Sequence, residues 1–128
     1  QINEYLEAYN GEGIQHIACF TDDIYTTVEN MIAAGVKFLD TPDTYFDAVD
    51  VRIPEHGEDL QRLRRNKILI DAHPETKRRK LLQIFTQNAV GPIFFEIIQR
   101  KGNEGLGEGN FQALFESIER DQIRRGVL

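Results

Sequence analysis

The stretch PIFFEIIQR, residues 92–100, decides how the rest of the sequence is interpreted. Side chains alternate across a β-strand, so Phe94, Glu96 and Ile98 share one face, while the opposite face is also apolar. Residues 93–100 are therefore predicted to form a strand that is covered on both sides. A single glutamate interrupts its apolar face, and that residue needs an explanation.

Two shorter strands are predicted just before this one. Residues 67–71 and 80–86 are rich in aliphatic side chains, and Pro74 and the pair Gly91-Pro92 separate the three segments. The carboxy-terminal half therefore starts as three consecutive strands.

The amino-terminal half is predicted to contain a strand, a helix and a second short strand. Residues 14–20 alternate as a strand, and residues 36–39 form the short one. The helix between them begins after Asp22 or Asp23 and ends before Gly35. Its apolar stripe, spaced i, i+4, i+7 and i+8, comprises Ile24, Val28, Met31 and Ile32.

Helices account for the remaining segments. Residues 42–66 indicate a helical insertion in two pieces, broken at Pro54 and Gly57, and residues 4–9 indicate a short leading helix. After the glycine-rich segment 102–109, a closing helix presents one apolar face made of Phe111, Leu114, Phe115 and Ile118. Without the insertion and the terminal helices a βαβββ unit remains, so the predicted fold class is α+β.

Composition places the chain among ordinary globular domains. It has 128 residues, of which 41% are hydrophobic and 28% charged, and its net charge of −6 argues against nucleic acid as a partner. A single cysteine, Cys19, rules out an internal disulfide and favours a reducing, cytoplasmic compartment. No apolar run approaches the roughly 18 residues of a membrane span. The start at Gln1, without a methionine, indicates a piece of a longer protein.

Each of three predicted strand faces carries a single polar side chain, which is His16, Gln83 or Glu96. A buried, unpaired carboxylate costs several kcal/mol, so Glu96 needs a proton, a partner or a metal ion. An imidazole and a carboxylate could together bind Fe(II), Mn(II) or Zn(II), and two histidines with one carboxylate form the facial triad of Fe(II) oxygenases. The alternative is that each is an ordinary hydrogen-bonded residue. No third ligand is evident, because His56 and His73 lie in polar loops and are predicted to be surface residues.

The aromatic residues Phe85, Phe94 and Phe111 have two interpretations. They could pack in the core, or, because two of them share faces with Gln83 and Glu96, they could contact a ring-shaped ligand beside a metal. The glycine-rich segment before the closing helix lacks the Gly-Lys-Ser/Thr that ends a phosphate-binding loop. A movable flap is the better interpretation of that segment.

Four motifs in this order resemble the 4-hydroxyphenylpyruvate dioxygenase family: GIQHIA at residues 13–18, LLQIF at 81–85, FFEIIQRKG at 94–102 and GEGNF at 107–111. That family belongs to the vicinal oxygen chelate superfamily, whose paired βαβββ modules form an open barrel around a metal ion. The resemblance implies that residues 1–128 are a carboxy-terminal catalytic half-domain, namely the second module plus a closing helix, of a longer two-domain enzyme.

By this resemblance, His16 and Glu96 bind one Fe(II) per subunit in the intact enzyme, and a histidine upstream of Gln1 completes the ligand set. Gln83 resembles the catalytic glutamine that contacts the substrate. The expected substrate-binding set is Gln83, Phe85, Phe94, Asn110, Phe111, Gln15 and Gln1. Strand alternation, however, points Gln15 away from His16. Leu106 departs from the family, which often has phenylalanine there.

The implied reaction in the intact enzyme converts 4-hydroxyphenylpyruvate and O2 to homogentisate and CO2, a step of tyrosine and phenylalanine catabolism. Because one ligand is missing, the 128 residues alone are expected to be inactive. Exposed sheet edges and an uncovered inner face are expected to make two copies pair, so a homo-oligomer is predicted. Two alternatives remain: hydroxymandelate synthase chemistry on the same substrate, and a ligand-binding module of the same fold without catalysis.

Overall fold

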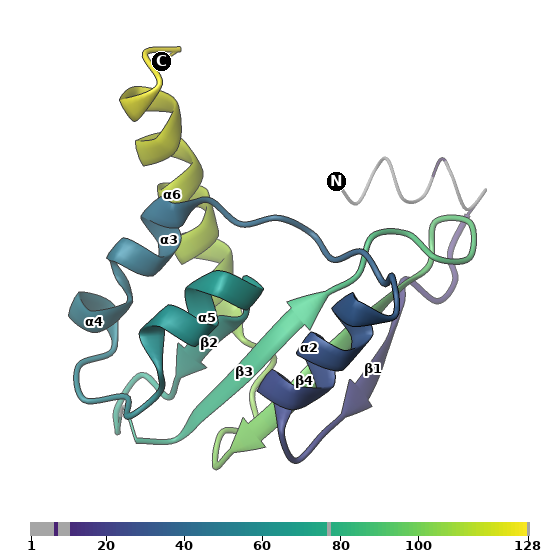
Figure 1. The fold of residues 1–128 in the computed structure, drawn as a ribbon, viewed down its shortest axis with the longest axis horizontal. Coiled ribbons are helices and arrows are strands. Elements are labelled where there is room, and N and C mark those ends of the chain that lie inside the picture. The colour runs from purple at the N-terminus through teal and green to yellow at the C-terminus, as the bar shows by residue number, and fades with distance from the viewer. Residues whose placement is uncertain (1–6, 8–10, 77, 128) are drawn as a thin grey trace.

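The computed structural model describes residues 7, 11–76 and 78–127 (Figure 1). The short helix expected over residues 4–9 falls largely outside them, and so does Gln1. None of the helices in the described part combines the length and the apolar character that crossing a bilayer requires.

Four strands form one mixed sheet: β1 (His16–Phe20), β2 (Leu69–Ala72), β3 (Lys80–Phe85) and β4 (Phe94–Lys101). Their order across the sheet is β1-β4-β3-β2 (Figure 1). β1 runs parallel to β4, whereas β3 is antiparallel to both β4 and β2. The α+β class is confirmed, and once the strand expected at residues 36–39 is left out, the observed order is βαβββ. The first and last strands of this unit lie side by side.

The described helices are α2 (Ile24–Ala33), α3 (Asp43–Asp47), α4 (Val49–Arg52), α5 (Leu60–Asn66) and α6 (Glu108–Arg124). α2 and α5 lie over one face of the sheet, whereas α6 packs against α3 and β2 (Figure 1). The insertion contains three short helices and not two pieces, because the backbone also turns at Ala48. The predicted break near Pro54 and Gly57 is confirmed, and Gly57 has the positive φ of 74° that glycine adopts without strain.

The first helix, α2, begins and packs as its sequence predicts. The side chain of Asp23 accepts hydrogen bonds from the backbone N–H of Thr26 (3.2 Å) and from its hydroxyl (2.7 Å), which caps the helix. Ile24 and Val28 are fully buried beneath it, whereas Ile32 is 46% exposed, so the buried stripe is narrower than expected.

The hydrophobic core lies between these helices and the sheet face that carries Leu82, Ile84 and Ile97. Ile24 of α2 and Leu63 of α5 pack in the same cluster, and both are fully buried. Each such aliphatic side chain contributes roughly 1.5–3 kcal/mol through burial. This layer holds the sheet rigid on one side and leaves its other face for a site.

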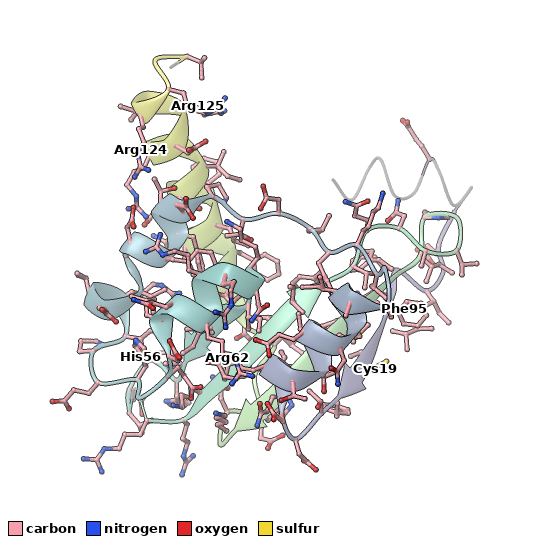
Figure 2. The ribbon with its side chains drawn as sticks, viewed as in Figure 1. Cys19, His56, Arg62, Phe95, Arg124 and Arg125 are labelled. Carbon is pink, nitrogen blue, oxygen red and sulfur yellow. The ribbon has the colours of Figure 1, made fainter. Side chains whose placement is uncertain are left out.

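Arg62 joins α5 to α2, and Figure 2 shows it between the two helices. Its guanidinium donates two hydrogen bonds to the carboxylate of Glu29, at 2.9 and 2.8 Å. Hydrogen bonds from Arg62, and then from Asn66, lower the pKa of Glu29 to about 2. The pair therefore stays charged throughout the neutral pH range.

Two strand predictions need correction. Residues 36–39 do not form a strand, because only an isolated bridge joins Phe38 to Thr86 before the chain enters the insertion. β1 was expected to be covered on both sides, yet all five of its residues are exposed. Apolar side chains make a strand suitable for burial, but another part of the protein has to supply the surface that packs against it.

The closing helix α6 buries only part of the face predicted for it, since of its four residues Leu114 alone packs against the core. Phe111, Phe115 and Ile118 are 71%, 64% and 46% exposed. The helix instead packs through Ala113 and Ser117, whose small side chains let it approach its neighbours closely. Periodicity identified an apolar stripe correctly, but not the surface that would bury it.

A buried carboxylate fastens the insertion to the end of the sheet. The Glu58 side chain is 4% exposed and pairs with Lys80 of β3 and with Lys101 of β4 (3.0 Å). The hydroxyl of Tyr25 donates to the same carboxylate at 2.9 Å. Burial raises the pKa of Glu58, but the hydrogen bonds from Lys80, Lys101 and Tyr25 outweigh burial and leave that pKa below its ordinary value of 4.5.

The variant Glu58→Gln is expected to lower the free energy of unfolding at pH 7 by about 2 kcal/mol, which is less than for a fully dry pair because Lys101 is partly exposed. The folded-state pKa is depressed, so the stabilising contribution is present above the unfolded pKa and is lost as the pH falls through the folded pKa. Urea unfolding at several pH values should therefore show the gap to wild type closing below pH 4.5. Glu104→Gln, whose side chain is 89% exposed, is the control. A gap that does not change with pH would contradict this account.

Candidate metal and ligand site

The histidine and the glutamate singled out by the sequence lie together on the open face of the sheet. His16 starts β1 and pairs with Phe94, and Ala18 pairs with Glu96, so His16 and Glu96 are diagonal neighbours on one face. The His16 Nε2 and Glu96 Oε1 atoms are 3.3 Å apart. Glu96 is 7% exposed, whereas the His16 side chain is 35% exposed. Parallel pairing of the first and last strands therefore brings the two residues together.

The spacing of these two atoms fits a shared metal ion. Nitrogen and oxygen ligands bind first-row metals at about 2.0–2.2 Å, so two adjacent ligands at right angles lie about 3 Å apart. The 3.3 Å separation matches that geometry, and the ligand types suit Fe(II), Mn(II) and Zn(II). Within the described ranges, no group of three or more histidine, cysteine, aspartate and glutamate side chains could hold an ion. The described residues thus present a pair of candidate ligands and not a full set.

Gln15 contacts His16 despite the alternation rule. Its side chain curls back, and its Oε1 atom lies 3.2 Å from His16 Nδ1. The sequence argument that Gln15 points away is therefore wrong, because a long side chain can reach a neighbour that the backbone directs elsewhere. An amide oxygen can only accept, so Nδ1 is the donor in this contact, and Nε2 is the ring nitrogen that faces Glu96. Metal-binding histidines use their second nitrogen in this way.

Gln83 and Asn110 extend the polar cluster behind Glu96. Gln83 Nε2 donates to Glu96 Oε2 at 2.8 Å, and Asn110 Nδ2 donates to Gln83 Oε1 at 2.8 Å. Gln83 is 2% exposed and Asn110 is 3% exposed. Because Gln83 occupies Oε2, the other carboxylate oxygen remains available on the side of His16.

Aromatic rings form one wall beside the pair. Phe94 stacks on the His16 imidazole, with ring centroids 5.1 Å apart and an interplanar angle of 10°. Phe85 meets both rings edge-on, at 6.3 Å from His16 and 6.0 Å from Phe94. Phe111 and Leu106 are exposed, at 71% and 73%, and the ring pairs seen among the described residues include none between Phe111 and this wall. Both side chains are therefore accessible to a ligand or to another protein surface.

Three residues that sequence reasoning missed support this cluster from behind. The Tyr45 hydroxyl donates to Asn110 Oδ1 (2.5 Å), and Arg52 Nη2 donates to the Tyr45 oxygen (3.0 Å). Burial raises the pKa of Tyr45 to about 12, so the hydroxyl keeps its proton. Asp71 accepts the backbone N–H of Gly109 at 2.9 Å and so anchors the first turn of α6. No local sequence signal marks these residues, because they lie in the insertion and on a distant strand.

His56 was predicted to be a surface residue, and the structure corrects this. It is 8% exposed, its Nε2 lies 2.7 Å from Asp50 Oδ1, and its Nδ1 accepts the backbone N–H of Glu58 at 2.9 Å. Figure 2 shows it among the helices of the insertion, well apart from Cys19 and Phe95. His56 therefore holds a loop together, far from the candidate ligand pair.

The comparisons with known proteins find one superfamily model and several similar proteins. Residues 2–53 match the Glyoxalase/Bleomycin resistance protein/Dioxygenase superfamily. Hemolysin VllY of Vibrio vulnificus is 66% identical over all of this chain, which covers 36% of that protein. The 4-hydroxyphenylpyruvate dioxygenases of Legionella pneumophila and Pseudomonas aeruginosa are each 62% identical over the whole chain, which covers 37% and 36% of them. The chain thus spans little more than a third of the length of these relatives.

Solved structures support the same likeness. A mutant 4-hydroxymandelate synthase from Streptomyces coelicolor superposes with a TM-score of 0.76 at 37% identity, over 95% of this chain and 34% of that one. A fusion of a xylose isomerase-like TIM barrel with a 4-hydroxyphenylpyruvate dioxygenase gives a TM-score of 0.73 at 32% identity, over 92% of this chain and 19% of the fusion. The fold is therefore that of this group of proteins.

Proposed function

Because the chain corresponds over its whole length to the carboxy-terminal part of 4-hydroxyphenylpyruvate dioxygenases, we propose that the intact protein converts 4-hydroxyphenylpyruvate and O2 to homogentisate and CO2. The single observation that carries this proposal is the 3.3 Å approach of His16 and Glu96 on the open sheet face. Residues 1–128 are then the carboxy-terminal catalytic half-domain of a longer two-domain enzyme.

The ion we propose is Fe(II), held by His16 Nε2 and Glu96 Oε1. The family resemblance assigns the remaining protein ligand to a histidine upstream of Gln1. When bound, Fe(II) would supply a Lewis-acid centre for a 2-oxo acid and the redox chemistry that a reaction with O2 needs. The fit rests on the ligand types and on their spacing, which suits two adjacent positions around one ion.

The residues of this chain then bind and orient the substrate. Gln83 Nε2 carries a second hydrogen beyond the one given to Glu96, and we assign it to an oxygen of the substrate. Phe85 and Phe94 would flank the aromatic ring of the substrate and exclude water from that side. Phe111, which follows Asn110 at the start of α6, would cover the substrate from above as part of a movable lid.

Product analysis with the intact protein tests the function. Incubation with Fe(II), 4-hydroxyphenylpyruvate and O2 is expected to yield homogentisate and one equivalent of CO2, identified by mass spectrometry. The likeness to a hydroxymandelate synthase makes that enzyme the second candidate, and 4-hydroxymandelate as product would establish it. Retained binding of the substrate without any product would favour a ligand-binding module and would exclude both enzymes.

Partners and location follow from the same proposal. The substrate would be a small aromatic 2-oxo acid, and the single cysteine, Cys19, suits a reducing cytoplasm. We also propose a homo-oligomer, because large apolar side chains are exposed on β1 and α6, among them Phe20 at 71% and Phe115 at 64%.

A further inference from the structure

A line of hydrogen bonds runs from the edge of the sheet to the candidate metal ligand. It starts at Ile70 in β2, which is the edge strand opposite β1. Side chains of the insertion contact the backbone N–H and carbonyl of Ile70. The Ile70 N–H donates to the Tyr45 oxygen at 2.9 Å, and Arg52 Nη2 donates to the Ile70 carbonyl at 2.9 Å. Arg52 Nη2 also donates to the Tyr45 oxygen at 3.0 Å. The backbone N–H and carbonyl of Ile70 thereby have hydrogen-bond partners.

These contacts decide where the hydroxyl proton of Tyr45 points. Its oxygen has two acceptor positions, and the Ile70 N–H and Arg52 fill both. Its one proton could go to the Ile70 carbonyl at 3.0 Å or to Asn110 Oδ1 at 2.5 Å. The Ile70 carbonyl already accepts from Arg52, whereas no other donor to Asn110 Oδ1 is seen among the described residues, and the Asn110 contact is the shorter one, so the proton goes to Asn110.

The same logic orients the two amides that follow. Because Asn110 turns its oxygen to Tyr45, its nitrogen donates to Gln83 Oε1. Gln83 must then turn its nitrogen to Glu96, where it donates to Oε2. An arginine at one end can only donate and a carboxylate at the other end can only accept, so the whole line has one direction. The three inner members and the carboxylate at the end are buried: Tyr45, Asn110, Gln83 and Glu96 are 1%, 3%, 2% and 7% exposed.

We propose that Tyr45, anchored by Arg52, is a positioning residue that fixes the direction of the Asn110 and Gln83 amides and thereby leaves Glu96 Oε1 free for the metal ion. The inference rests on the proposed function, since it assigns the free oxygen to that ion. Without the tyrosine proton, Asn110 can rotate its amide, and Gln83 then faces an acceptor on both sides, Asn110 Oδ1 and Glu96 Oε2, with only one amide nitrogen to offer. Two facing acceptors repel each other, and the carboxylate would turn away from His16.

The competing explanation is that Tyr45 only protects the edge of β2. That role would affect stability but would leave the metal site unchanged. The chain offers a matched control in Tyr25, which is 8% exposed and whose hydroxyl donates to Glu58, away from this line of bonds. Tyr25→Phe and Tyr45→Phe each remove one buried hydroxyl with a hydrogen-bonded partner, so both should lower the unfolding midpoint.

The first measurement is the Fe(II) affinity of the intact protein by anaerobic calorimetry. Tyr45→Phe is expected to weaken Fe(II) binding about tenfold, the lower end for a partner outside the ligand sphere. The Fe(II) affinity of Tyr25→Phe is expected to stay within twofold of the wild-type value. In a Gln83→Ala background, Tyr45→Phe should have no further effect, because its influence passes through Gln83. The proposal would be overturned if Tyr45→Phe left the Fe(II) affinity unchanged. It would also be overturned if Tyr45→Phe weakened Fe(II) binding as much in the Gln83→Ala background as in the wild type.

The second measurement needs no metal and separates this inference from the proposed function. Side-chain amide resonances of Gln83 are assigned by their loss in Gln83→Ala, using NMR spectra of the metal-free intact protein. Tyr45→Phe is expected to shift these resonances, and Tyr25→Phe to leave them in place. A shift without any Fe(II) binding by wild type would refute the proposed ion but keep the directed line of amides. Unshifted resonances would refute the directed line even if the enzyme makes homogentisate.

Discussion

Replacing His16 or Glu96 by alanine is expected to lower kcat/KM for 4-hydroxyphenylpyruvate on the order of 10³-fold, which corresponds to about 4 kcal/mol of lost transition-state stabilisation. The reason is that each variant removes one of two adjacent atoms, 3.3 Å apart, proposed to hold the same ion. Fe(II) affinity should fall together with activity in both variants. Steady-state kinetics and anaerobic calorimetry on the intact protein measure the two quantities.

Matched controls separate loss of the ion from loss of the fold. His73→Ala replaces a loop histidine whose Nδ1 accepts only the backbone N–H of Glu75 at 3.2 Å, among the contacts seen in the described residues. Glu119→Ala removes an exposed carboxylate from α6. Both controls should keep wild-type activity and Fe(II) affinity. If His16→Ala and Glu96→Ala fold and still bind Fe(II) as wild type does, the proposed ligand pair is wrong and the binding-module alternative gains support.

Gly107→Ala is expected to lower kcat/KM by about 100-fold, the scale of a misplacement near 1 Å in an active site. A Cβ atom at this position would lie 1.8 Å from Gln83 Oε1, so the glutamine must move. Moving it breaks its hydrogen bonds to Asn110 and Glu96 together. Stability should fall by a smaller amount, about 1–2 kcal/mol, because the clashing atom ends a flexible side chain.

Gly126→Ala controls for the backbone strain in this experiment. Gly107 and Gly126 have φ of 77° and 75°, but a Cβ atom at Gly126 would meet nothing within 4 Å. Both variants therefore carry the cost of a left-handed alanine, whereas only one displaces Gln83. We expect Gly126→Ala to lose some stability and to retain full activity. Equal kinetic losses in the two variants would show that strain, and not the position of Gln83, is responsible.

Much of the candidate site could be derived from alternation along single strands. That rule placed His16, Gln83 and Glu96 each as the one polar residue of an apolar face, and the register puts all three on the same side of the sheet. The rule holds because the side-chain period of a strand is set by backbone geometry within a few residues. It fails for Gln15, since a flexible side chain with several bonds can return to His16.

Other features depended on surfaces that the local pattern does not contain. The apolar stripe of α6 includes Phe111 and Phe115, yet it is the small face at Ala113 that packs. His56 lies in a polar stretch, yet Asp50 and a backbone amide bury it. In both cases the deciding contact comes from another element, so no window of sequence could reveal it.

The sequence by itself determined the strand faces, the cap of α2 at Asp23 and the pair of residue types that could bind a metal, because these follow from geometry within a few residues of the chain. Only the tertiary structure decided that β1 lies beside β4 and that Tyr45 and Arg52 of the insertion direct the amides behind Glu96. Strand pairing and buried hydrogen bonds join residues that are far apart in the chain, so they are set when the chain packs as a whole.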